Sequence, residues 1–177
     1  MALDSGQMAI HAGEKDLALA LDPGRDKTGF AFVNLEGNLI LSGIFSSGER
    51  ENFFAEIERA LPNLSHWIQE DRSESLPENL THHLRVIIIG DGTTSQEFSS
   101  WVKNRTSCYG CDIMTVDERN TTLEARSLYW KIHRPGLFAR LIPEGLRVPK
   151  RVLDDLAAWA VALRGVKKYR DIRQDKL

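Results

Sequence analysis

Acidic residues recur where apolar runs of this sequence end. Asp22 ends the alternating run LALALD, Asp91 follows VIIIG, and Glu118 comes just after DIMTV. Asp154 and Asp155 stand near the head of another apolar segment, VLDDLAAWAV. A carboxylate at the end of a buried segment is costly to desolvate unless a cation or water meets it. The sequence therefore predicts either a bound cation at these positions or segment ends that lie in water.

Carboxylates that come close together repel one another, and a bound cation or raised pKa values relieve that repulsion. Hard oxygen ligands favour Mg²⁺ or Mn²⁺, which keep some of their waters and complete their shell with substrate phosphates. Two such ions about 4 Å apart can activate an attacking water and stabilise the leaving oxygen of a phosphodiester. The candidate catalytic residues and metal ligands are Asp22, Asp91, Glu118, Asp154 and Asp155.

Each acidic residue also has a purely structural explanation. Asp22-Pro23-Gly24 has the residue types of a turn, and Asp91 could begin a turn or cap a helix. The acidic residues at 117–118 and 154–155 could favour the positive end of a helix. Four separate structural roles for acidic residues at one edge of a predicted sheet are less common than one shared site. We therefore prefer the interpretation that these acidic residues converge.

The first third of the chain predicts a meander of strands and then a helix. The strands are expected over 17–21, 28–34 and 38–45, with the hairpin turn Leu35-Glu36-Gly37-Asn38 between the last two. Apolar residues recur at helical spacing from Phe53 to Ile68, and Pro62 should kink or split that helix. Residues 71–83, DRSESLPENLTHH, have the composition of a loop.

Strands and helices alternate in the remaining sequence. RVIIIG is too apolar for a half-exposed strand and is expected at the centre of a sheet that is covered on both faces. The expected elements are a strand over 85–90, a helix opened by a capping box of Thr94 and Glu97, a strand over 112–116, a helix opened by a capping box of Thr121 and Glu124, a loop over 134–149 and an amphipathic helix over 152–166.

The order βββαβαβα predicts a mixed five-stranded sheet flanked by helices, which is the RNase H-like fold of the α/β class. In such a sheet the carboxyl ends of parallel strands face one edge, where ligands bind. The length of 177 residues suits one domain. We expect this domain over 17–170, with a flexible extension over 1–16 and a tail over 171–177.

Composition is that of an ordinary globular protein, with 42% apolar and 27% charged residues and a net charge of −2. The longest uninterrupted aliphatic run, VIII, is far shorter than a membrane span. The start of the chain contains acidic residues and does not resemble a signal peptide. We therefore expect a cytoplasmic protein with no membrane partner.

Basic residues concentrate in the last third. Between Asp117 and Arg151 there are eight basic and four acidic residues, and from Arg164 onward there are six basic and two acidic ones. Such a surface suits a polyanionic partner, although a solvated helical face explains the tail equally well. Candidate nucleic-acid contacts are Arg25, Lys27, Arg119, Arg126, Lys131, Arg134, Lys150 and Arg151. Trp130 could stack on a base, whereas Tyr129 falls on an apolar helix face and is expected in the core.

Cysteine and histidine offer weaker signals. The motif CYGC, Cys108 to Cys111, could be redox-active or bind zinc, but no second cysteine or histidine pair stands at ligand spacing. We interpret it as a turn before a strand. His82 and His83 are expected in a polar loop, and His11 in the first segment, without convincing partners.

Four segments resemble the YqgF branch of the RuvC-like RNase H-fold nucleases. They are DPGRDKTGFAFV (22–33), VIIIGDGT (86–93), VDERNTTLEAR (116–126) and RLIPEGLRVPKRVLDDLAAWAVAL (140–163), of which VDERNTTLEAR is the most specific. The resemblance extends from about residue 17 to about residue 163. It implies that Asp22 is the first-strand metal ligand, Glu118 the acidic ligand of the DER segment and Asp154 the helix aspartate, with Asp155 as a near-equivalent.

The resemblance implies a hydrolase: a metal-dependent endonuclease that cuts structured nucleic acid, either a ribosomal RNA precursor or a four-way DNA (Holliday) junction. RuvC-like resolvases place their second carboxylate after the fourth strand, where this chain has Asp91, whereas short YqgF proteins use the DER segment instead. This sequence offers both, so the choice between Asp91 and Glu118 stays open. RuvC-type resolvases act as dimers, which makes a homodimer a further expectation.

Two other functions fit parts of the sequence. A non-catalytic nucleic-acid module could keep the fold without cleaving anything. ATPases of the actin and sugar-kinase type also begin with an Asp-Gly-rich hairpin, and GDGTT resembles their second phosphate loop. That class closes two such domains over its nucleotide, and 177 residues hold one.

Overall fold

The computed structural model describes residues 14–60, 81–92, 95–107, 109–119, 121–132 and 153–175. Its elements are, in order, β1 (Glu14–Pro23), β2 (Lys27–Asn34), β3 (Leu39–Ser46), the short 3-10 helix η1 (Ser47–Glu49), α1 (Arg50–Ala60), β4 (Thr81–Gly90), α3 (Ser95–Thr106), β5 (Asp112–Val116), α4 (Thr121–Ile132) and α5 (Asp154–Gln174). The described residues confirm the expected strands and helices in their predicted succession. Because α5 follows α4 directly, the order is βββαβαβαα, one helix more than βββαβαβα.

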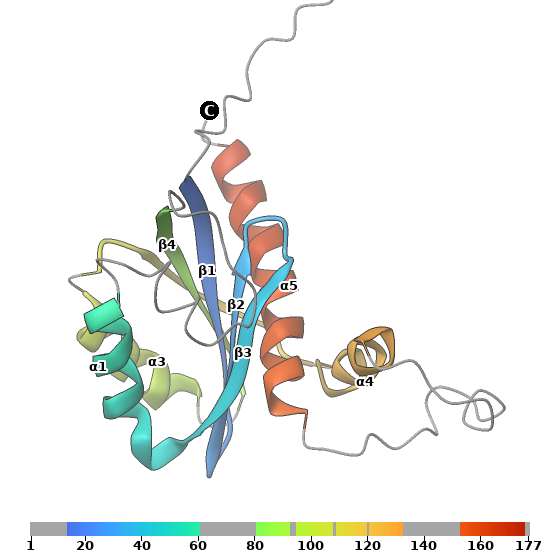
Figure 1. Cartoon of the computed structure of the whole chain (residues 1–177), viewed down its shortest axis with the longest axis horizontal. Helices are drawn as coiled ribbons and strands as arrows, with labels where there is room; N and C mark the ends of the chain where they lie inside the picture. The colour runs from blue at the N-terminus through green and yellow to red at the C-terminus, as the bar shows by residue number, and fades with distance from the viewer. Residues whose placement is uncertain are drawn as a thin grey trace, which may run out of the picture.

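The five strands form one sheet in the order β3-β2-β1-β4-β5. β2 runs antiparallel to both β1 and β3, while β1, β4 and β5 are parallel. Helices α1 and α3 lie on one face of the sheet, and α5 crosses the other face with α4 beyond it (Figure 1). This mixed sheet between helices is the RNase H-like fold that the element order predicts. The carboxyl ends of β1, β4 and β5 therefore meet at one edge.

The run LALAL in β1 divides large from small side chains. Leu17, Leu19 and Leu21 lie in a core cluster with Phe54 of α1 and Val102 of α3. Since neighbouring residues of a strand point to opposite faces, the alanines between them face α5. They pack there in a second cluster that includes Ala18, Ala20, Ile88 and Val161.

Small residues let α5 lie very close to the sheet. A Cβ added at Gly29 of β2 would overlap the backbone oxygen of Asp154 in the first turn of α5. A Cβ at Gly165 of α5 would in turn overlap the side chain of Ile88 in β4. Trp159 of α5 also donates a hydrogen bond from Nε1 to the backbone oxygen of Gly37, at 3.0 Å. The first contact places the start of α5 beside the end of the β1–β2 hairpin, and the other two hold the helix further along the sheet.

The prediction of a loop up to residue 83 is wrong for its last three residues, because β4 begins at Thr81. Composition alone missed this segment because it is polar, whereas backbone pairing holds it in the sheet: Thr81 lies opposite Glu14 and His83 opposite Asp16 of β1. Asp16 also accepts a hydrogen bond from Nε of Arg85, at 2.6 Å. β1 is correspondingly longer than the predicted 17–21.

Two helix ends also differ from prediction. α5 begins at Asp154 instead of 152 and continues to Gln174 instead of 166, because Val166 and Tyr169 are still buried against the sheet. α4 begins at Thr121, so this threonine is the first helical residue, and Glu124 pairs with Arg164. The predicted capping residue Thr94, the helical positions beyond Ala60, the loop over 134–149 and Cys108 lie outside the described residues. Within the described part of the chain, no helix is long and apolar enough to cross a membrane.

Candidate functional site

Asp22 ends β1 on the face that α5 covers. Its partner across the β1–β2 hairpin is Gly29, and the turn between the two strands is closed by a 2.9 Å hydrogen bond from the Gly24 N–H to the Lys27 oxygen. The spacing of the motif DPGRDKTG therefore places its aspartate and its last glycine side by side. Because Gly29 lacks a side chain, the first turn of α5 approaches Asp22.

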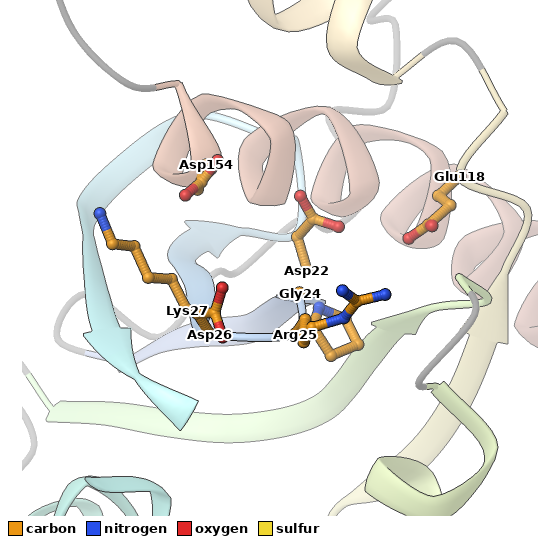
Figure 2. A pocket seen from close by; sticks show the side chains of 8 residues that line it. Asp22, Gly24, Arg25, Asp26, Lys27, Glu118 and Asp154 are labelled. Atoms are coloured by element: carbon orange, nitrogen blue, oxygen red, sulfur yellow. The ribbon is translucent and has the colours of Figure 1, made fainter. Parts of the chain in front are cut away.

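A cavity of about 580 Å³ opens at this end of the sheet. Its lining comes from the end of β1, the β1–β2 turn, the segment after β5 and the start of α5. Figure 2 shows the Asp22 carboxylate between those of Asp154 and Glu118, with Arg25, Asp26 and Lys27 around the turn. The structure thus brings three of the five predicted acidic residues to one cavity.

The pKa of the Asp22 carboxyl is raised to about 7, and burial is the largest cause. The negative charge of Glu118, a side-chain hydrogen bond between Asp22 and Glu118, and the negative charge of Asp154 supply the rest of this increase. Two ionised carboxylates are both acceptors, so this hydrogen bond requires a proton on one of the two carboxyl groups. The site therefore concentrates negative charge that a proton, or a cation in its place, must balance.

Glu118 reaches the cavity through a gap left by two glycines. A Cβ at Gly90 would lie 2.5 Å from Glu118 Oε2, and one at Gly92 would overlap Glu118 Oε1. Oε2 is buried and accepts no hydrogen bond from the described residues. A buried carboxylate oxygen without a donor is costly. A proton shared with Asp22, or a cation in its place, would satisfy this oxygen.

Asp91 does not line the cavity. It follows β4, as the sequence predicts, but its Oδ1 accepts a hydrogen bond from the Glu118 backbone N–H at 3.0 Å. Its own N–H donates to the Val116 oxygen, also at 3.0 Å. Asp91 therefore contacts the main chain that carries Glu118, and Glu118 is the residue of the two that enters the cavity.

Asp155 also lies outside the cavity lining. It is buried, with 6% of its surface exposed, and its Oδ2 accepts a 3.4 Å hydrogen bond from Ser42 Oγ of β3. Successive residues of a helix point about 100° apart, which follows from 3.6 residues per turn. Asp154 and Asp155 therefore face different surroundings although they are adjacent in sequence.

The basic residues predicted to contact nucleic acid also differ in whether they line the cavity. Arg25 and Lys27 line the cavity. Arg119 is exposed and pairs with Asp117, with 3.0 Å between Nε and Oδ2. Arg126 and Lys131 lie on α4, whereas Arg134, Lys150 and Arg151 lie outside the described residues. On the same helix, Tyr129 is buried as predicted, and Trp130 packs partly buried beside it.

Arg164 was expected from the sequence only as part of the basic tail, but it makes internal contacts. Its guanidinium donates to the backbone oxygens of Asp117 at 2.6 Å and Arg119 at 2.7 Å, and to Glu124 Oε1 at 2.6 Å. The signal was present in the sequence: Arg164 continues the core-facing spacing of Ala157 and Val161. An arginine at such a position indicates an internal contact. Asp26, which also lines the cavity, had no sequence signal of its own.

The donor set of the cavity suits a hard divalent cation. Asp22, Glu118 and Asp154 supply only carboxylate oxygens, and one of these oxygens is buried without a donor among the described residues. Within the described residues, no three acidic, histidine or cysteine side chains are close enough to hold one metal ion together. Mg²⁺ is commonly bound through one or two carboxylates, with waters and substrate phosphates completing its shell. The residues therefore fit Mg²⁺ or Mn²⁺ in type and charge. They would give each ion fewer protein ligands than a metal site that is coordinated by protein alone.

Comparison with known proteins gives only remote likenesses. No family model matches the chain. No curated protein matches it either. Among solved structures, it is similar to T. thermophilus RuvC in complex with a Holliday junction substrate, with a TM-score of 0.42 and 16% identity over 87% of this chain and 94% of that chain.

Two further structures are similar over smaller parts. One is a ROK family transcriptional regulator, a homolog of the E. coli MLC protein, with a TM-score of 0.35 and 14% identity over 67% of this chain and 31% of that one. The other, from Cytophaga hutchinsonii, is described as a sugar kinase, with a TM-score of 0.31 and 10% identity over 64% and 38%. The RNase H-like assignment of this chain accordingly follows from its own sheet order and strand directions.

Proposed function

We propose that this protein is a metal-dependent nuclease of the RuvC-like class that hydrolyses phosphodiester bonds in structured nucleic acid. The observation that supports the proposal most is the cavity in which Asp22, Glu118 and Asp154 meet and in which burial and both neighbours raise the pKa of Asp22 to about 7. The resemblance of VDERNTTLEAR and DPGRDKTG to YqgF proteins gives the same residues the same roles.

Asp22, Glu118 and Asp154 would hold Mg²⁺ or Mn²⁺, with two ions expected. When bound, the ions would polarise the scissile phosphate and lower the pKa of an attacking water. The protein's own residues supply three further functions. The carboxylates make the pocket negative, the buried Oε2 of Glu118 provides an acceptor that no described residue meets with a donor, and Arg25 and Lys27 at its rim attract phosphates.

A cleavage assay on a labelled four-way DNA junction and on a structured ribosomal RNA precursor tests the proposal. Cleavage should require Mg²⁺ or Mn²⁺ and should be abolished by Asp22→Asn, Asp154→Asn and Glu118→Gln. The exposed Asp171 on the distal part of α5 offers a matched control, and Asp171→Asn should cut at the wild-type rate. Cleavage that survives Asp22→Asn would contradict the assignment.

Metal binding gives a second readout that does not depend on finding the substrate. Calorimetric titration of Mn²⁺ into the wild-type protein should show binding that each of the three variants weakens. The variants should melt at the same temperature as the wild type without metal, or higher, because carboxylate repulsion is relieved. Binding of Mn²⁺ and nucleic acid without any cleavage would instead identify a non-catalytic nucleic-acid module.

The finer parts of the proposal follow from the resemblance. Together with the nuclease assignment we propose that the protein belongs to the YqgF branch and cuts a ribosomal RNA precursor or a Holliday junction. We also propose that it acts in the cytoplasm and assembles as a homodimer. Comparing cleavage of the RNA with cleavage of the junction decides the substrate, and sedimentation of the full chain decides the dimer.

A further inference from the structure

We propose that Asp91 and Arg164 are positioning residues that hold the Glu118 segment from two sides and so set the entry of its carboxylate into the cavity. The inference rests on the proposed function, because it assigns how one acidic residue of that site is placed. Neither residue lines the cavity, and both act through the backbone of residues 117–119.

Asp91 holds the segment from the β4 side. Its backbone N–H is bonded to the Val116 oxygen at the end of β5, and its carboxylate accepts the Glu118 N–H, each at 3.0 Å. A hydrogen bond to an ionised carboxylate is roughly twice as strong as a neutral one. The residue therefore links the ends of two parallel strands and uses its carboxylate on the main chain.

Arg164 holds the same segment from α5. Its guanidinium reaches the oxygens of Asp117 and Arg119, the residues on either side of Glu118, and also the Glu124 carboxylate. Only 29% of its side chain is exposed. A planar guanidinium has five donors in a fixed fork, whereas a lysine ammonium is a compact charge that cannot match three separate acceptors in the same way.

Other contacts fix the remaining freedom of this turn. The Glu118 oxygen accepts the Thr121 N–H at 3.0 Å, and the Arg119 N–H donates to Asp117 Oδ1 at 2.8 Å. With its main chain held at both its N–H and its oxygen, Glu118 extends into the gap above Gly90 and Gly92. The carboxylate thereby lines the same cavity as Asp22 (Figure 2).

Two substitutions at Asp91 separate a positioning role from a metal-ligand role. In Asp91→Asn the amide oxygen can still accept the Glu118 N–H, so Mn²⁺ affinity and cleavage should fall by no more than about fivefold. In Asp91→Ala the acceptor is lost, and both should fall about 10- to 100-fold, as for residues that orient a ligand. If Asp91→Asn lowers Mn²⁺ affinity as much as Glu118→Gln does, Asp91 is a ligand and the proposal is wrong.

The effect of Arg164 is tested with Arg164→Lys, which keeps the charge and should lose about 10- to 100-fold in Mn²⁺ affinity. Arg105 on α3 offers a matched control, since its side chain is also 29% exposed and binds Glu58 through two nitrogens. Arg105→Lys should leave Mn²⁺ affinity unchanged. Equal losses in the two variants would mean that Arg164 contributes only to general stability, and would overturn its part of the proposal.

Amide hydrogen exchange of the metal-free full chain provides a readout without activity. The Glu118 N–H should exchange faster in Asp91→Ala than in the wild type or in Asp91→Asn. Unchanged protection in Asp91→Ala would overturn the proposal. Should Arg164→Lys fail to fold, the Asp91 pair carries the test.

The proposed function can fail separately. If Glu118→Gln leaves Mn²⁺ binding and cleavage at the wild-type level, the nuclease site itself is wrongly assigned. If Glu118→Gln lowers both and the Asp91 and Arg164 variants behave as their controls do, only the positioning roles are wrong.

Discussion

On the α1–α3 face the buried sheet residues are leucine, isoleucine and phenylalanine, while on the α5 face they are mostly alanine and valine, with Ile88 as the exception. The first face packs aromatic rings against one another: Phe45 and Phe53 stack with ring centres 4.2 Å apart, and Phe54 meets Trp101 edge to face. The second face brings a helix so near that Gly29 has no room for a Cβ beside Asp154. The three predicted acidic residues that line the cavity, Asp22, Glu118 and Asp154, lie on the side of this second face (Figure 2).

The difference indicates that the two faces of the sheet have different roles, one in stability and the other in placing the site. Large apolar side chains bury more area and supply most of the packing energy, whereas small ones allow the close approach that places a helix end beside a strand end. Changes on the α1–α3 face should therefore affect stability without affecting metal binding. Changes on the α5 face should affect both.

The largest effect on stability is expected from Phe54→Ala on the α1–α3 face. Phe54 is completely buried, so the substitution should lower the free energy of unfolding by about 3–5 kcal/mol. Urea unfolding measures this change. At a temperature where the variant remains folded, its Mn²⁺ affinity should equal that of the wild type. A weakened affinity in the folded variant would contradict the division between the two faces.

The next-largest effect should be a dependence of stability on pH, and it should arise from Asp22 on the α5 face. The pKa of Asp22 is about 7 in the folded protein against 3.8 ordinarily. Between these values the folded state binds more protons than the unfolded state, so its stability falls as pH rises from about 4 to 7. By linkage, this fall amounts to about 4 kcal/mol at most.

Urea unfolding of the metal-free protein at pH 5 and pH 8 measures the effect. Asp22→Asn should remove this part of the pH dependence and should be the more stable protein at pH 8. Saturating Mg²⁺ should also reduce the difference in the wild type, because a cation then takes the place of the proton. A variant that keeps the full pH dependence would show that other groups cause it.

Gly29→Ala should have a smaller effect on stability and an additional effect on the site. The new Cβ would overlap the Asp154 backbone oxygen, and overpacking of this kind lowers stability by about 1–3 kcal/mol. Because α5 must shift, Mn²⁺ affinity should fall as well. The control is Gly48→Ala in η1, where an added Cβ meets nothing nearer than Ser46 Oγ at 3.8 Å, and where both quantities should stay unchanged.

The smallest effect is expected from a lysine at the rim of the cavity. Lys27 lines the cavity, while Lys103 is exposed on α3 at the other face. Lys27→Met should weaken nucleic-acid binding a few-fold and reduce the salt dependence of binding by about one charge. Lys103→Met should do neither, and stability should change by no more than about 0.5 kcal/mol in either variant. Equal losses in the two variants would mean that nucleic acid does not approach the α5 side preferentially.

Much of the fold could be predicted because its signals are local. The alternation in LALAL, the continuous run RVIIIG and the helical spacing of the last segment each identified an element. The prediction failed where long-range pairing decided the outcome. Thr81, His82 and His83 are polar and show no apolar alternation, and they extend β4 by pairing with β1.

For the candidate site, the sequence by itself determined which segments carry acidic residues and that those segments end at one edge of the sheet. Only the tertiary structure decided which side chains enter the cavity. It selected Glu118 rather than Asp91 and Asp154 rather than Asp155, and it turned Arg164 inward. The physical reason is that a side chain's direction after a strand or on a helix depends on partners far away in the chain, such as Ser42 for Asp155 and the Asp117 carbonyl for Arg164. Residue types and their spacing show which chemistry is possible, and the packing of the folded chain decides which side chains are placed to carry it out.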